Sequence, residues 1–107
     1  MFRDLPWSKS EKQIARRAFD AAYEKECRAI SAKLIRMTHD DSDPRYIWRI
    51  HDYLSEQRRA TDEKYDYRYS VLIRVFGALI REGWLTEADL QGLSDDKLRM
   101  IRKWVTL

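Results

Sequence analysis

The sequence is poor in cysteine, glycine and proline: its 107 residues include one Cys, three Gly and two Pro. The single cysteine, Cys27, excludes a disulfide within the chain, and without a Cys-x-x-Cys pair the usual zinc spacing is missing. The scarcity of Gly and Pro leaves long uninterrupted stretches, and no segment alternates apolar and polar residues as a half-buried strand does. These absences predict an all-α protein of the reducing cytoplasm that carries no cofactor.

Long apolar runs are missing as well. The most apolar segment, VLIRVFGALI at 71–80, contains Arg74 and is far shorter than the ~20 residues that a membrane span needs. The N-terminus has no apolar core of a signal peptide. We therefore expect a soluble chain without an integral membrane span.

The positive charge is small and evenly spread. The formal net charge of +3 comes from 9 basic and 8 acidic residues in 1–43, and from 6 against 5 in both 44–69 and 70–107. Proteins that bind nucleic acid usually concentrate their cations on one face or tail, so we expect no nucleic-acid partner. A small helical nucleic-acid-associated protein stays open as an alternative, and it would use Arg58, Arg59, Arg68, Lys97, Arg99, Arg102 and Lys103.

Capping signals predict where the helices begin and end. Ser8 and Glu11 form a Ser-x-x-Glu capping box before a helix that has no Gly or Pro through about Met37. The polar residues in the middle of this helix are expected to face water: Glu24, Lys25, Glu26 and Arg28.

The later helices follow the same logic. Asp43 is a natural N-cap with Pro44 at the first helical position, and the second helix is expected to reach about Tyr65–Tyr67. A third helix over 70–81 ends at Gly83, which suits the left-handed C′ position. Short fourth and fifth helices are capped by Thr86 with Asp89 and by Ser94.

The second helix mixes apolar and ionisable residues on one side. A 100° wheel places Ile47, Ile50, His51, Leu54, Arg58, Thr61 and Tyr65 on one stripe, with Trp48, Asp52 and Arg59 along its flank. A buried Arg or His is costly unless paired. His51 and Arg58 therefore need partners from elsewhere.

Catalysis and metal binding are weak interpretations of these residues. His51 and Asp52 are adjacent, so their side chains are expected to point about 100° apart and not to form a hydrogen-bonded dyad. No nucleophile motif accompanies them, and we expect no enzyme. The loop with His39, Asp40, Asp41 and Asp43 lacks the Gly and the twelfth-position Glu of a calcium-binding EF-hand, so no metal site is predicted.

A homodimer explains the second helix better. Trp48 and Arg58 are residue types enriched at protein-protein hot spots, and an antiparallel crossing near residues 54–56 would bring Asp52 opposite Arg58 of a second copy. We predict a single domain over 1–107, with a dimer seam on long antiparallel helices (8–69) and a small helical head (70–107). The alternative is that these residues contact other helices of the same monomer.

The third helix is apolar almost all round. Only Arg74, Gly77 and Arg81 form a narrow polar line along it. We expect the helix to be buried on most sides, with Arg74 marking the strip that meets solvent.

Several motifs together resemble the fluorescence recovery protein family of cyanobacteria. They are W-x-x-H-D-x-L-S-x-x-R from Trp48 to Arg58, then D-x-K-Y-D-Y-R-Y-S-V-L-I-x-V-F, and E-G-W-L at 82–85. The resemblance is close over 45–107 and looser over the first helix, where it includes Pro6–Ser8.

The resemblance implies an all-helical, non-enzymatic homodimer in the cytoplasm, at the cytoplasmic face of thylakoids in a cyanobacterium. Its partner would be the photoactivated orange carotenoid protein, chiefly the C-terminal domain, whose red-to-orange return it would speed, ending photoprotective quenching. The family's interface and functional residues map onto Trp48, His51, Asp52 and Arg58, and Leu54 lies among them.

One position departs from the family pattern. Members of the family carry Phe where this chain has Arg74, in the head region that contacts the carotenoid protein. The resemblance maps the family's basic head residue onto Arg102 or Lys103, so Arg74, Arg102 and Lys103 are the predicted partner-binding residues. An aromatic side chain exchanged for a cation changes the contact chemistry. A homologue with a different protein partner is therefore the second hypothesis.

Overall fold

The regular elements of the chain are all helices. The computed structural model describes residues 5–39 and 43–107, and in those ranges it contains no strand. The elements in chain order are α1 (Lys9–Thr38), α2 (Tyr46–Lys64), α3 (Leu72–Arg81), the 3₁₀ helix η1 (Glu87–Leu90) and α4 (Asp95–Val105). The predicted all-α class is confirmed.

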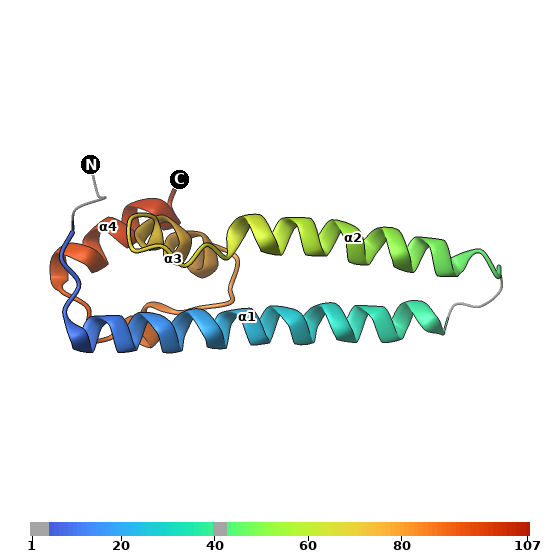
Figure 1. The fold of residues 1–107 in the computed structure, drawn as a ribbon, viewed down its shortest axis with the longest axis horizontal. Coiled ribbons are helices and arrows are strands. Elements are labelled where there is room, and N and C mark those ends of the chain that lie inside the picture. Colours follow the sequence, from blue (N-terminus) through green and yellow to red (C-terminus); the bar gives the residue numbers. More distant parts are fainter. Residues whose placement is uncertain (1–4, 40–42) are drawn as a thin grey trace.

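The molecule is a rod with a thick end (Figure 1). α1 runs along its whole length, α2 returns antiparallel to it, and α3, η1 and α4 gather at the end where α1 begins. The principal extents are 54 × 25 × 23 Å and the Cα radius of gyration is 16.8 Å, whereas a compact domain of this length would have about 13 Å. We call the hairpin of α1 and α2 the stem, and residues 70–107 the head.

The capping signals read from the sequence are confirmed at α1, η1 and α4. The Ser8 hydroxyl accepts from the Glu11 backbone N–H (3.1 Å), and the Glu11 carboxylate accepts from the Ser8 N–H (3.0 Å). Thr86 and Asp89 form the same reciprocal pair before η1. Ser94 accepts from Lys97 at the start of α4.

Two helices begin at residues other than those predicted from the sequence. α2 begins at Tyr46 after Arg45, so Asp43 is not its N-cap and Pro44 lies before the helix. The reason is a turn in which the Asp43 carboxylate accepts from the Arg45 N–H (3.0 Å) and the Asp43 carbonyl accepts from Tyr46 (2.9 Å). α3 begins at Leu72, two residues later than expected.

The head contains most of the buried core. Fully buried side chains of α3, η1 and α4 pack there against small residues in the first half of α1. α2, in contrast, buries only Thr61. The core residues are Ala15, Ala18, Phe19, Ala22, Leu72, Ile73, Val75, Phe76, Leu79, Leu85, Leu90, Leu93 and Ile101.

Gly77 belongs to this core, so the prediction that it lies on an exposed polar line is wrong. A Cβ atom at Gly77 would stand 2.3 Å from the Cβ of Trp104 on α4. At Gly77 the backbones of α3 and α4 approach closely, and only the lack of a side chain permits that approach. Arg74 and Arg81 are exposed as predicted.

Candidate protein-protein interface

One flank of the stem exposes apolar side chains around a hollow between its two helices. Leu54 of α2 and Tyr23 of α1, which are 37% and 42% exposed, both border this hollow. Ile47 and Trp48 of α2 and Ile35 of α1 are also exposed, at 48%, 63% and 56%. Isolated exposed apolar residues are ordinary, but several on the two helices of a stem that lacks a core of its own are typical of a contact surface.

The apolar flank contains a shallow hollow of about 290 Å³ between the two stem helices. Leu54 and Arg58 border it from α2, opposite Tyr23 of α1. A bulky side chain from another molecule could enter at this point. The lining residues are Tyr23, Cys27, Ile30, Leu54, Gln57, Arg58 and Thr61.

Arg58 stands at the rim of the hollow with its guanidinium group exposed. Its Nε atom donates to the Asp62 carboxylate one turn further along α2 (2.9 Å), and this hydrogen bond and the Asp62 charge raise the pKa of Arg58. The prediction that Arg58 is buried and needs a partner from elsewhere is wrong for the single chain, because its side chain is 78% exposed and its partner Asp62 lies on the same helix. An ion pair with Asp52 of a second copy stays a prediction.

His51 and Asp52 do form a hydrogen bond, so the prediction that they cannot is wrong. The His51 Nδ1 and Asp52 Oδ1 atoms are 3.3 Å apart. Their Cβ atoms diverge around the helix, but on an open surface the two side chains can bend toward each other. Both side chains are exposed on the open surface of α2, at 69% and 83%.

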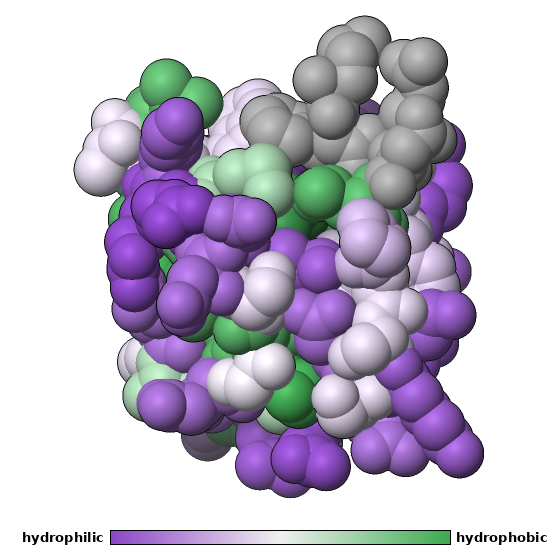
Figure 2. Space-filling model, turned by 90° about the vertical axis from the view of Figure 1, so that its left-hand side faces the viewer, coloured by the Kyte–Doolittle hydropathy of each residue, from purple (hydrophilic) through white to green (hydrophobic). Residues whose placement is uncertain are grey.

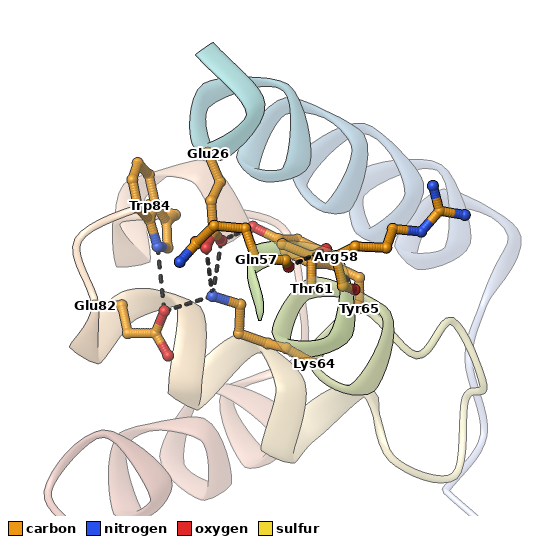
Figure 3. Close-up of polar contacts among 8 residues, drawn as sticks. All are labelled: Glu26, Gln57, Arg58, Thr61, Lys64, Tyr65, Glu82 and Trp84. Atoms are coloured by element: carbon orange, nitrogen blue, oxygen red, sulfur yellow. Dashed lines mark hydrogen bonds and ion pairs between the residues drawn. The ribbon is translucent and has the colours of Figure 1, made fainter. Parts of the chain in front are cut away.

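A buried polar cluster connects the stem to the head, and the sequence did not indicate it. The Lys64 Nζ atom of α2 lies 2.7 Å from Glu26 Oε1 of α1 and 2.6 Å from Glu82 Oε1 at the end of α3. Tyr65 donates to Glu26 (2.8 Å) and the Trp84 indole donates to Glu82 (3.2 Å). Figure 3 shows these five side chains converging from α1, from the end of α2 and from the segment that follows α3.

The prediction that Glu26 faces water is wrong, since the residue is only 7% exposed. A partner 38 residues away in sequence makes its burial tolerable. Burial works against the charge of Lys64, but hydrogen bonds to Glu26 and Glu82 raise its pKa above the ordinary 10.5. Burial and the hydrogen bond to Glu26 raise the pKa of Tyr65. At neutral pH the cluster is therefore an ion network with a neutral phenol.

The predicted head residues occupy different surroundings. Arg74 is exposed on α3 and Lys103 is exposed on α4. Arg102 forms a two-pronged ion pair with Glu87 of η1, at 2.6 and 2.8 Å, which raises the pKa of the Arg102 guanidinium and lowers that of the Glu87 carboxyl. Figure 2 shows the head end as a mainly hydrophilic surface with small hydrophobic areas.

The cations required by the nucleic-acid alternative are mostly neutralised. Arg58, Arg59 and Arg68 pair with carboxylates on their own segments, and Lys97 is buried against Glu11 (3.1 Å). Arg99 pairs with Asp96, and Arg102 with Glu87. To bind these cations, the phosphate backbone of a nucleic acid would first have to displace the carboxylates that already pair with them. The ion pairs therefore weigh against the nucleic-acid alternative.

Two other absences apply to the described ranges only. No helix within 5–39 or 43–107 combines the length and apolar character that crossing a bilayer requires. In the same ranges no three His, Cys, Asp or Glu side chains gather as metal ligands would. Asp40 and Asp41, considered above for metal binding, lie outside the described residues.

Comparison with known proteins gives one family. Residues 7–104 match the family described as photoprotection regulator fluorescence recovery protein. The fluorescence recovery protein of Synechocystis sp. is 35% identical over 99 residues, which cover 92% of this chain and 91% of that protein. The structure of the Fremyella diplosiphon fluorescence recovery protein is 41% identical, with a TM-score of 0.90, and the match covers 95% of this chain and all of that one. The Synechocystis structure has the same TM-score and coverage at 35% identity.

Proposed function

Because the chain belongs to the fluorescence recovery protein family of photoprotection regulators, we propose that it is a non-enzymatic homodimer whose partner is the photoactivated orange carotenoid protein. The dimer binds the C-terminal domain of that protein and accelerates its return from the red to the orange form. Photoprotective energy quenching then ends. Family membership over almost the whole chain is the observation that carries this proposal.

The exposed flank of the stem supports the dimer. Trp48 and Leu54 expose apolar surface on a helix that buries only Thr61 within its own chain. A two-fold contact would cover the same patch on both copies, with Arg58 and Trp48 as the anchor types that dominate such interfaces. His51 and Asp52 would lie within this contact.

The mechanism that we propose is differential binding. A partner that binds one conformation of the carotenoid protein more tightly shifts its population and lowers the barrier to that conformation. The dimer needs no side-chain chemistry for this, only a rigid surface. Arg74, Arg102 and Lys103 of the head would contact the partner. Arg74 and Lys103 would supply positive charge, since Arg102 is already paired with Glu87.

Arg74 supports a second candidate function. Its exposed guanidinium group stands where the family pattern has an aromatic ring, and a cation prefers carboxylates to an apolar pocket. A dimer of the same fold with a different protein partner would use this position for an acidic contact.

The dimer is tested by sedimentation of two arginine variants. Arg58→Glu places a carboxylate in the seam and is expected to weaken the dimer about tenfold or more. Arg99→Glu makes the same charge change at an exposed position of α4 in the head, away from the stem helices, and should sediment as the parent does. If both variants stay fully dimeric at low concentration, the seam lies elsewhere.

The carotenoid-protein partner is tested by adding the chain to photoconverted orange carotenoid protein in the dark. The red-to-orange recovery rate should rise with the amount of dimer added. If excess dimer leaves the rate unchanged, the second candidate replaces the first. If an Arg74→Phe variant then accelerates the red-to-orange recovery, the residue at position 74 of the head explains why the parent does not.

A further inference from the structure

The other flank of the stem carries a basic groove that the dimer and the head do not use. Two neighbouring hollows of about 220 and 130 Å³ lie there, and the half-buried Trp84 borders both of them. Figure 3 shows Trp84 and Arg58 on opposite sides of α2. We call this surface, bordered by Arg17, Lys25, Lys33, Arg36, Tyr53 and Trp84, the basic groove.

The cations of the basic groove follow one edge of α1. Lys25 and Lys33 are eight residues apart, which is about 12 Å along a helix, and Arg17 and Arg36 extend the row in both directions. Ala21 and Ala29 lie between them on the same edge. Because these side chains are small, the space between the cations stays open.

These four cations have no ion pair with any carboxylate in the ranges 5–39 and 43–107. Elsewhere on the same helix, Arg16 pairs with Asp20 and Arg28 pairs with Glu24. Lys33 instead places its Nζ atom 4.7 Å from the centroid of the Tyr53 ring. The groove therefore offers positive charge and aromatic surface side by side, on a chain that neutralises most of its other arginines.

Two acidic residues border the groove but leave its charge positive. Glu26 is already bound by Lys64 and Tyr65. Asp89 accepts from the Thr86 backbone and hydroxyl groups, and its pKa is lowered first by the backbone hydrogen bond and to a smaller extent by the charge of Lys25, so three of the four cations remain without a nearby acidic partner among the described residues. A continuous chain of phosphates would meet the Asp89 carboxylate. A ligand that alternates carboxylates with apolar side chains would avoid it and would cover Trp84.

We propose that the basic groove binds an acidic helical segment of a partner protein. The segment carries carboxylates two turns apart, facing Lys25 and Lys33, and an apolar residue between them that packs on Trp84. This contact is separate from the proposed dimer seam and head contact, because Arg58 and Leu54 lie on the other flank. A dimer formed through that flank leaves both of its basic grooves open.

Fluorescence anisotropy with a labelled helical peptide tests the inference. The probe is an Ala-based helix with Glu at positions i and i+7 and Leu between them, and its matched control has Gln in place of both Glu. The parent protein is expected to bind the Glu peptide at least about tenfold more tightly than the Gln peptide at low salt. The double variant Lys25→Glu, Lys33→Glu should lose this preference and should bind a Lys version of the peptide instead.

A second double variant tests whether the loss of Glu-peptide binding depends on the groove itself and not on net charge. Lys9→Glu with Lys12→Glu makes the same change in net charge on exposed positions of α1 outside the groove, and it should bind the Glu peptide as the parent does. Sedimentation of both double variants should give the parent's oligomeric state, which separates this test from that of the dimer. Equal binding of the Glu and Gln peptides, or equal loss in both variants, would overturn the inference. So would tighter groove-dependent binding of single-stranded DNA or anionic vesicles than of the Glu peptide.

Discussion

Replacing Lys64 with methionine tests whether the buried cluster holds the head on the stem. Methionine keeps the apolar length of the side chain but removes the donor to both Glu26 oxygens (2.7 and 2.9 Å) and to Glu82 (2.6 Å). Glu26 is then left with the Tyr65 hydroxyl alone. Hydrogen bonds to charged groups contribute about 1.5–3 kcal/mol each, and breaking a fully buried ion pair costs about 3–5 kcal/mol.

The expected loss of stability for Lys64→Met lies between the contribution of one such hydrogen bond and the cost of breaking a fully buried ion pair. The Glu82 side chain is 40% exposed and keeps water as a partner, so the cost comes mainly from Glu26. We expect Lys64→Met to lower the free energy of unfolding by about 2–3 kcal/mol. Urea unfolding at one fixed protein concentration measures it, because any dimer makes the apparent stability depend on concentration.

Arg59→Met is the matched control. Arg59 also bridges two carboxylates, Glu56 and Glu63, but all three side chains are exposed, so its loss should cost about 0–1 kcal/mol. In a double-mutant cycle, Lys64→Met and Glu26→Gln should couple by about 1 kcal/mol or more. If Lys64→Met costs no more than Arg59→Met, the cluster does not hold the head, and the reasoning from burial is wrong.

Alkaline pH provides an independent check on the same cluster. The folded-state pKa of Lys64 is raised above 10.5 and that of Tyr65 above 10.0. A group with a raised folded-state pKa contributes stability below its unfolded value and loses it as the pH climbs through the folded value. The parent should therefore lose stability above about pH 10 more steeply than Lys64→Met, which lacks one of the two groups.

Three further outcomes are expected. Gly77→Ala should cost about 3 kcal/mol or more, because its Cβ would collide with Trp104 and α3 and α4 would have to move apart. Gly83→Ala, in open space at φ 87°, should cost only the roughly 1–2 kcal/mol of a left-handed alanine. Thermal unfolding compares the two, and a loss at Gly77 no larger than that at Gly83 would contradict the close approach. Burial opposes the charge of Glu11, but the Ser8 and Ser94 backbone donors and Lys97 hold its pKa below 4.5, so its stabilisation is present above that pH and fades below it. Glu11→Gln should thus flatten the acid limb of stability against pH. Lys97→Met should destabilise the parent at pH 7 more than it destabilises Glu11→Gln, in which only its hydrogen bond to the Pro6 carbonyl is lost. Additive losses would contradict the pair.

Local signals predicted the helices well because their causes are local. A capping box at Ser8 and Glu11, or Gly83 after α3, satisfies backbone groups within a few residues, so the pattern is complete in the sequence. Asp43 shows the limit of such signals. The same carboxylate can cap a helix or a turn, and here the turn before Arg45 is formed instead.

The contacts between distant segments could not be read in the same way. Glu26 looks like a solvated residue beside Glu24 and Lys25, and only the return of α2 brings Lys64 to it. Gly77 looks like a gap in a polar line, and only the crossing of α4 shows why a side chain is excluded. Both depend on which helices meet, and periodicity within a single helix carries no information about that.

For the site residues too, the sequence predicted what depends on one helix and missed what depends on contacts with other parts of the molecule. The stripe on the second helix correctly placed Leu54 and Arg58 side by side, because that is a property of one helix. The polar partner of Arg58 within the chain, Asp62, was one turn away and could have been found from the i,i+4 spacing.

The stem has two helices of 30 and 19 residues, and α2 has one buried residue, Thr61. A hairpin with so little interior cannot persist far from the head by itself, since isolated helices gain little in water. In the proposed dimer, the half of the stem that is far from the head buries its apolar side chains only against a second copy. Folding there becomes a bimolecular event: amide exchange at 46–60 would slow as more protein is added, while exchange within the head would not respond. The abundance of the chain, and not temperature alone, then decides how much of it is structured.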